Sequence, residues 1–144
     1  ILFSSALELE LINVNIMNKL IVDATADKIF LVLIIDKNIY TCSYENIKSN
    51  FEKLIVLINE FLIKYKTSTD NIEKIYINRG PGSYAGIRNS LSIAKGLFLS
   101  KKIDYYCFSF SDFNNIQKIK YEDVPNLCDK FKIKKNLIKP LYLS

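Results

Sequence analysis

One short stretch of the chain collects the residues best suited to hold an anion. All four glycines and both arginines of the 144-residue sequence fall between Arg79 and Gly96. Glycines between a strand and a helix let backbone N–H groups approach a phosphate at the helix N-terminus. The spacing Gly80-x-Gly82-x-x-x-Gly86 is one residue longer than the dinucleotide fingerprint, and no lysine stands where a P-loop needs it. The stretch therefore departs from both standard phosphate motifs.

The same loop also has a purely structural explanation. Its motif residues are Gly80, Pro81, Gly82, Ser83 and Gly86. Glycines beside a proline permit a tight turn, and a serine before a helix is a natural N-cap. Small residues at every fourth position, Gly86, Ser90 and Ala94, would form a smooth row that lets the helix lie close to a sheet or to another helix. Packing alone could account for the motif.

A carboxylate at the end of the first apolar run is the second group that could do chemistry. Asp23, followed by Thr25, could form a nucleotide site in which the carboxylate coordinates a magnesium-bound phosphate, as in a phosphotransferase or ATPase. It could also belong to a nuclease that gathers carboxylates around two metal ions. The other carboxylates weighed for that site are Glu45, Glu52 and Glu60. A solvated or turn-capping Asp23 is the interpretation we favour.

Composition removes much other chemistry. The sequence has no histidine, which excludes Ser-His-Asp triads and zinc sites built on histidine. Its three cysteines, Cys42, Cys107 and Cys128, form no C-x-x-C pair, so we predict core residues rather than a disulfide framework or metal ligands. We expect neither a metal nor a cofactor.

Charge and hydropathy restrict the partners and the compartment. The net charge of +5 comes mainly from scattered lysines, which we attribute to AT-rich coding rather than to a DNA-binding face. Lysines gather locally between Lys130 and Lys139, which could be a patch for nucleic acid or a solvated face. No apolar run is long enough to cross a bilayer, and the first residues lack the basic start of a secretory signal. We expect a cytoplasmic protein with no membrane contact.

Periodicity predicts the elements that position these residues. Apolar runs and turn residues predict antiparallel strands over 20–22, 28–35 and 39–44, a helix over 49–65, a strand over 72–78, a helix over 84–100 and a strand over 103–108. Ser49 and Glu52 would form a capping box at the start of the first helix. The order βββαβα predicts a single α/β domain with a mixed sheet and flanking helices.

The helix over 49–65 carries an apolar stripe wider than a surface helix needs for its own core. The stripe consists of Phe51, Leu54, Ile55, Leu57, Ile58, Phe61, Leu62 and Tyr65, while Val56 and Ile63 lie on another side. A broad core contact explains it, and so does a contact between part of the helix and a second chain.

The string RGPGSYAGIRNSLSIAKGL, together with the upstream LIVDATADKIFLVLI and the ending KPLYLS, resembles the TsaB (YeaZ) family of bacterial tRNA threonylcarbamoyladenosine biosynthesis proteins. Ala85 departs from the family's usual threonine, and Asn89-Ser90 from an apolar residue and glycine. The resemblance implies an ASKHA fold on an RNase H-like core. It divides the chain from residue 17 onward into an RNase H-like lobe over 17–113 and a remnant of a second lobe with a tail over 114–144. Because Met17 stands directly before the first strand-like run, we expect residues 1–16 to be an extension or a misplaced start.

The resemblance also implies a function. A member of this family is a non-catalytic subunit that pairs with and activates the transferase subunit TsaD, within a wider complex that includes a TsaE-like ATPase. It would reach tRNA indirectly and could form a homodimer when the partner is absent. The family's helix pairing places the partner interface at Phe51, Leu54, Ile58, Tyr84, Ile87, Arg88 and Leu91. Apolar and aromatic anchors of this kind usually dominate an interface.

Overall fold

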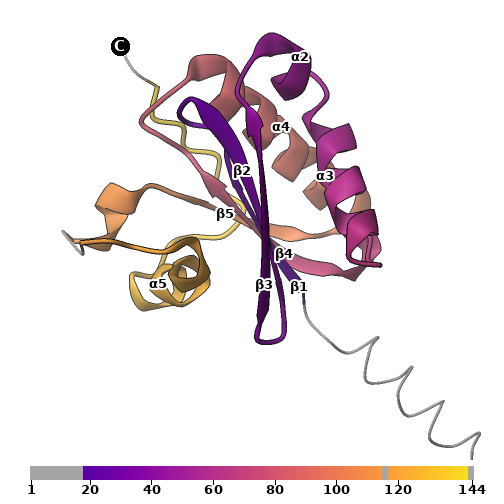
Figure 1. Cartoon of the computed structure of the whole chain (residues 1–144). Helices are drawn as coiled ribbons and strands as arrows, with labels where there is room; N and C mark the ends of the chain where they lie inside the picture. Colours follow the sequence, from indigo (N-terminus) through magenta and orange to yellow (C-terminus); the bar gives the residue numbers. More distant parts are fainter. Residues whose placement is uncertain (1–17, 115–116, 143–144) are drawn as a thin grey trace, which may run out of the picture.

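Five strands form one mixed sheet in the computed structural model, which describes residues 18–114 and 117–142 (Figure 1). The strands are β1 (Asn18–Asp23), β2 (Lys28–Ile35), β3 (Asn38–Glu45), β4 (Ile72–Asn78) and β5 (Asp104–Phe108). Their order across the sheet is β3-β2-β1-β4-β5. The pairs β1–β2 and β2–β3 are antiparallel, and β1–β4 and β4–β5 are parallel. The predicted βββαβα order is confirmed.

Helices lie on both faces of this sheet (Figure 1). They are α2 (Lys48–Phe51), α3 (Leu54–Lys64), α4 (Tyr84–Lys101) and α5 (Val124–Lys130), with short 3₁₀ turns η1 (Thr69–Asn71), η2 (Phe110–Phe113) and η3 (Tyr121–Asp123). The helices α3 and α4 cover one face, and α5 covers the other. None of the helices in the described part of the chain combines the length and apolar character needed to cross a membrane.

The predicted helix over 49–65 is two helices. The chain leaves α-helical geometry at Lys53, whose backbone N–H donates to the carbonyl of Asn50 in a 3₁₀-type bond of 3.1 Å. The predicted capping box is also wrong, because α2 begins at Lys48 and its N-cap is Ile47, so Ser49 lies within the helix. The Asn50 side chain instead donates to the carbonyl of Glu45 at 2.8 Å, which holds the short helix against the end of β3.

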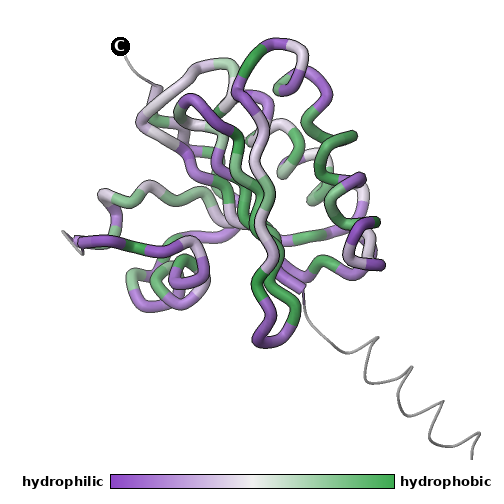
Figure 2. The backbone as a smooth tube through the Cα atoms, in the orientation of Figure 1, coloured by the Kyte–Doolittle hydropathy of each residue, from purple (hydrophilic) through white to green (hydrophobic). Residues whose placement is uncertain are grey.

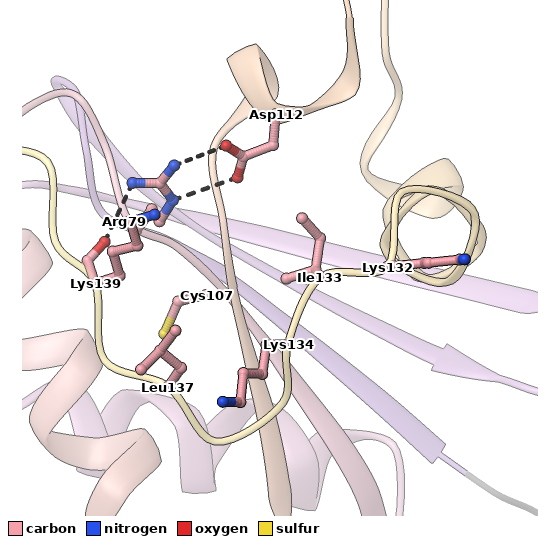
Figure 3. Close-up of a pocket in the computed structure, with 8 residues that line it drawn as sticks. All are labelled: Arg79, Cys107, Asp112, Lys132, Ile133, Lys134, Leu137 and Lys139. Carbon is pink, nitrogen blue, oxygen red and sulfur yellow. Dashed lines mark hydrogen bonds and ion pairs between the residues drawn. The ribbon is translucent and has the colours of Figure 1, made fainter.

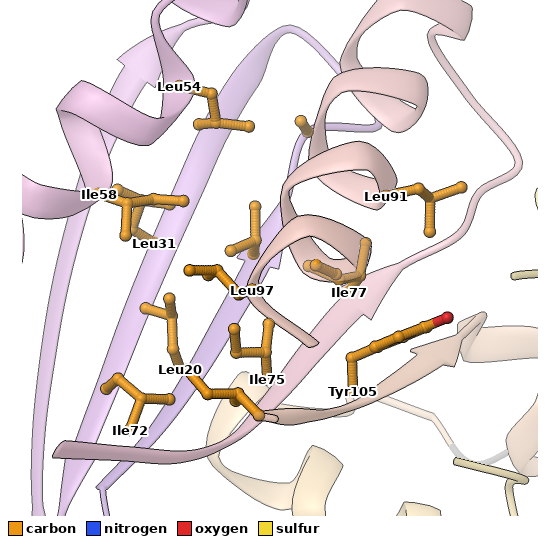
Figure 4. Close-up of a cluster of buried hydrophobic side chains, with 14 of the residues drawn as sticks. Leu20, Leu31, Leu54, Ile58, Ile72, Ile75, Ile77, Leu91, Leu97 and Tyr105 are labelled. Carbon is orange, nitrogen blue, oxygen red and sulfur yellow. The ribbon is translucent and has the colours of Figure 1, made fainter. Parts of the chain in front are cut away.

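Alternation along the strands divides the core into two layers. Successive side chains of a strand point to opposite faces of the sheet. Leu20, Leu31 and Ile75 thus pack toward α3 and α4, while Ile21 and Tyr76 pack on the opposite face with Phe113, Val124 and Cys128. Figure 4 shows the larger layer between the sheet and the two helices. In Figure 2 the hydrophobic backbone segments gather on the central strands and along α3.

The apolar stripe on α3 is mainly a core contact. Leu54, Leu57, Ile58, Phe61 and Leu62 are buried. Three further apolar residues of this helix stay in contact with solvent, Ile55, Val56 and Ile63, and the last is 69% exposed. The core contact accounts for the buried residues of the stripe, and a contact with a second chain stays a prediction for the exposed ones.

The three thiols are free, and two of them are buried as predicted. Burial raises the pKa of Cys107 to about 11 and that of Cys128 to about 12, both from an ordinary value of 9.0. Each thiol is therefore more easily ionised in the unfolded chain than in the folded one.

We expect the free energy of unfolding to decrease from about pH 9 upward, by as much as about 1.4 kcal/mol per pH unit for each buried thiol. The decrease in the free energy of unfolding that each thiol causes ends near the pKa of that thiol in the folded protein, about 11 for Cys107 and about 12 for Cys128. Urea denaturation at a series of pH values measures this slope. The double variant Cys107→Ala, Cys128→Ala should have a shallower slope, and an unchanged slope would contradict the assignment.

Candidate functional site

Asp23 lies at the centre of a hydrogen-bond network at the carboxyl ends of β1 and β4. It is 5% exposed, and both of its carboxylate oxygens accept bonds from this chain. Oδ1 accepts from the backbone N–H of Thr25 at 3.0 Å and from its hydroxyl at 2.7 Å. Oδ2 accepts from Nδ2 of Asn78 at 3.0 Å and from the hydroxyl of Tyr121 at 2.7 Å. The carboxylate caps its own turn and is buried rather than solvated.

Tyr121 reaches this network from a segment 98 residues further along the chain. Its ring lies 5.8 Å from that of Phe30 and 6.1 Å from that of Phe110, measured between centroids. Burial, followed by the charge of Asp23 and the hydrogen bond to it, raises the pKa of the Tyr121 hydroxyl. The hydroxyl therefore keeps its proton at neutral pH and serves as a permanent donor to Asp23.

The other carboxylates considered for a metal site do not join Asp23. Glu45, Glu52 and Glu60 are exposed, and Glu52 faces Lys48 at 3.8 Å across one turn of helix. No group of three or more histidine, cysteine, aspartate or glutamate side chains able to hold a metal occurs in residues 18–114 and 117–142. The arrangement around Asp23 thus gives no support to the nuclease alternative.

The glycine loop uses its own N–H groups to fold. The N–H of Gly80 donates to Oδ1 of Asn78 at 3.0 Å, and the N–H of Ser83 donates to the carbonyl of Thr25 at 2.8 Å. Ser83 is the N-cap of α4 as predicted, because its hydroxyl accepts from the N–H of Gly86 at 3.3 Å. These amides are therefore engaged within the loop rather than directed at an anion.

Glycine is required where the loop and α4 touch neighbouring backbone. Gly80 has a φ of 114°, which favours glycine. A Cβ at Gly82 would overlap the carbonyl of Thr25, and one at Gly86 would overlap that of Ala24. The predicted smooth row is confirmed, since Gly86, Ser90 and Ala94 are all buried.

The C-terminal tail closes the outer side of the loop. Leu141 donates its N–H to the carbonyl of Arg79 at 2.7 Å, and Tyr142 forms a parallel bridge with Gly82. The ring of Tyr142 lies 4.7 Å from that of Tyr84 at the start of α4. A segment about sixty residues further along the chain thus covers the glycine loop.

The predicted partner-interface residues divide into two groups. Leu54, Ile58, Ile87 and Leu91 are buried in the core of this chain, at most 4% exposed. Their side chains are therefore unavailable to a partner that docks on the surface of this fold. Tyr84 is 58% exposed, Arg88 is also exposed, and Phe51 is half-buried. The guanidinium of Arg88 lies 6.0 Å above the ring of Tyr84.

Two members of the Asp23 network were missed by sequence reasoning. Asn78 could have been found, because β1 and β4 were both predicted strands and the carboxyl ends of parallel neighbours meet at one edge of a sheet. The register places Val22 beside Ile77, which brings Asp23 next to Asn78. Tyr121 had no such signal, since it is 98 residues from Asp23 and lies in a 3₁₀ turn.

Known proteins resemble this chain in sequence and in fold. The family model of the tRNA N6-adenosine threonylcarbamoyltransferase TsaD matches residues 45–109. The tRNA threonylcarbamoyladenosine biosynthesis protein TsaB of Buchnera aphidicola subsp. Schizaphis graminum is 30% identical over 90 residues, which are 62% of this chain and 43% of that protein. TsaB of Buchnera aphidicola subsp. Baizongia pistaciae is 30% identical over 87 residues, which are 51% of this chain and 39% of that protein.

The solved structure of YeaZ from Pseudomonas aeruginosa matches with a TM-score of 0.60 at 16% identity, over 65% of this chain and 44% of that one. This likeness supports the predicted α/β fold of the ASKHA type. The chain spans less than half the length of the curated relatives that it matches. Similarity in sequence to two curated TsaB proteins, and in fold to YeaZ, supports the predicted resemblance to the TsaB/YeaZ family.

Proposed function

We propose that this chain is a non-catalytic component of the machinery that makes threonylcarbamoyladenosine in tRNA, and that it pairs with and activates a TsaD-type transferase. The names of its curated relatives support a role in this pathway. The observation that carries the non-catalytic part is the saturation of the Asp23 network, whose acceptors bond to Thr25, Asn78 and Tyr121 of the same chain.

The glycine loop supports the same proposal. A phosphate cradle needs backbone N–H groups that are free to bind the ligand. Here the N–H groups of Gly80, Ser83 and Gly86 donate within the chain, and Tyr142 bridges to Gly82. The motif thus holds α4 close against the turn after β1. Its proposed use is to present this helix to a partner rather than to bind a nucleotide.

The proposed contact lies on the exposed sides of α2, α3 and α4, which pack together beside the sheet (Figure 1). We define the pairing surface as Phe51, Ile55, Tyr84 and Arg88. Tyrosine and arginine are, with tryptophan, the residue types most enriched among energetically dominant interface positions. The pair formed by Tyr84 and Arg88 is therefore the expected anchor.

The double variant Tyr84→Ala, Arg88→Ala should weaken binding to the TsaD-type protein of the same organism by about 30-fold or more, which corresponds to about 2 kcal/mol. Both side chains are exposed, so the fold should be retained. Co-purification after co-expression, followed by titration of the purified subunits, measures the effect. The control is Lys95→Ala, Leu99→Ala, two exposed positions further along α4.

Failure of the unmodified chain to co-purify with its TsaD-type protein would refute the pairing. Equal weakening in the control would remove the assignment to Tyr84 and Arg88. Activation is tested separately, by measuring threonylcarbamoyladenosine in the tRNA of cells that lack their own TsaB and carry this chain.

The proposal has two further parts. The chain would form a homodimer in the absence of the partner, and it would join a wider assembly with a TsaE-like ATPase. Light scattering of the purified chain and of its mixtures would test both.

A further inference from the structure

A cavity of about 180 Å³ lies between the loop after β4, the strand β5, the turn η2 and the C-terminal tail (Figure 3). It is separate from the Asp23 network and from the pairing surface. Its lining residues are Arg79, Cys107, Asp112, Lys132, Ile133, Lys134, Leu137 and Lys139. Four of these eight residues are basic and one is acidic.

Arg79 lines the cavity with hydrogen-bonding capacity to spare. Its side chain is 9% exposed, and a guanidinium carries five N–H donors. Nε and Nη2 donate to the carboxylate of Asp112 at 3.3 and 2.7 Å, and Nη1 donates to the carbonyl of Lys139 at 3.3 Å. Three donors are used within the described structure. Two remain for a ligand.

The charges around the cavity are unbalanced. Asp112 uses both carboxylate oxygens on Arg79, and one of them also accepts from the N–H of Ser109 at 2.8 Å. In Figure 3 the side chains of Lys132 and Lys134 both extend away from Arg79. Counted over the whole lining, Arg79, Lys132, Lys134 and Lys139 contribute four positive charges against the one negative charge of Asp112, which leaves a net charge of +3. A dianion would neutralise most of this excess.

The remaining wall is apolar. Ile133 and Leu137 supply hydrocarbon, and Cys107 adds a buried thiol. Burial raises the pKa of that thiol to about 11, so it is neutral at pH 7. A ligand that fills the cavity would place its charged group at Arg79 and its carbon skeleton against these three residues.

We propose that this cavity binds a small phosphomonoester, with its phosphate at Arg79 and the lysines of the tail and with its apolar part against Cys107, Ile133 and Leu137. A phosphomonoester dianion would balance most of the net positive charge of the lining, and its oxygens can accept both spare N–H groups of Arg79. The tail supplies Lys134, Leu137 and Lys139, so ligand binding would also fasten this segment to the end of β5.

The test titrates the full chain with phenyl phosphate at low ionic strength, by calorimetry and by amide chemical shifts. Inorganic phosphate is the comparison, and we expect it to bind more weakly because it leaves the apolar wall unfilled. Lys134→Gln with Lys139→Gln should weaken binding of phenyl phosphate about tenfold or more. Arg79→Lys retains the charge but removes the spare donors, and should weaken binding to a similar extent.

The matched control is Lys28→Gln with Lys53→Gln, which removes the same charge at two exposed positions elsewhere. It should bind as the unmodified chain does. No shifts at the lining residues with phenyl phosphate up to about 10 mM would overturn the proposal, since that limit corresponds to less than about 3 kcal/mol of binding. Equal loss in the control would overturn it as well. A last titration uses a short single-stranded RNA. If the lining residues bind this RNA but not phenyl phosphate, the assignment to a small ligand is overturned.

Discussion

Gly86→Ala should destabilise the protein by about 3 kcal/mol, although alanine is the better helix former. A Cβ at this position would overlap the carbonyl oxygen of Ala24, far inside the 3.0 Å below which real Cβ contacts essentially do not occur. The obstacle is backbone, which cannot rotate aside as a side chain can. The nearby Asn46 side chain adds a second obstruction, since its Nδ2 donates to the carbonyls of Ala24 and Ala26. The whole turn after β1 would have to move.

The same helix contains its own control. Gly96 also lies within α4, but a Cβ there would meet nothing within 4 Å. Gly96→Ala should therefore raise the free energy of unfolding by about 0.5–1 kcal/mol through helix propensity alone. Urea denaturation followed by circular dichroism measures both variants. Equal effects in the two variants would show that close packing of α4 on the β1 turn does not explain the glycine motif.

The sheet and its helices could be predicted because their signals are local. Apolar alternation identified the strands, and the small-residue row identified the side of α4 that faces the sheet. The break between α2 and α3 was missed because nothing in the stripe interrupts its period. Near the break, Asn50 donates to the carbonyl of Glu45 five residues earlier, a side-chain bond that the apolar pattern does not indicate. The assignments of 114–144 to a second-lobe remnant and of Lys130–Lys139 to a nucleic-acid patch stay predictions, and residues 1–16 lie outside the described part of the chain.

The candidate site could be predicted only in part, because its contacts join residues that are far apart in the sequence. Residue types singled out Asp23 and the glycine loop, but they could not indicate which groups of the chain contact either one. Tyr121 donates to Asp23 and Tyr142 bridges to Gly82, and both come from distant parts of the chain. A periodic stripe likewise cannot distinguish residues buried in the core from those left for a partner. Ile58 and Ile55 lie three residues apart on α3, yet they are 1% and 37% exposed.

Asp23→Ala should cost about 4 kcal/mol of the free energy of unfolding. The substitution leaves the donors of Thr25, Asn78 and Tyr121 without their acceptor at a position that is 5% exposed. Each unsatisfied buried donor costs about 1–3 kcal/mol, and bonds to a charged acceptor are stronger than neutral ones. Tyr121→Phe removes a single bond to the carboxylate and should cost about 1.5–3 kcal/mol. Asp27→Ala, an exposed carboxylate on the same turn, is the control and should change stability by less than about 0.5 kcal/mol.

The variant Asp23→Asn distinguishes two roles of this carboxylate, a structural one and the binding of a ligand. An amide placed there would direct Nδ2 at another donor, Nδ2 of Asn78, so the variant should lose about 2 kcal/mol despite its nearly identical shape. A carboxylate held for a magnesium-bound phosphate behaves in the opposite way, because its charge is unfavourable until the ligand neutralises it. Removing that charge would stabilise the free protein and abolish any magnesium-dependent binding of ATP. A more stable Asp23→Asn, together with ATP binding by the unmodified chain in calorimetry, would restore the phosphotransferase hypothesis and contradict the structural role assigned to this network.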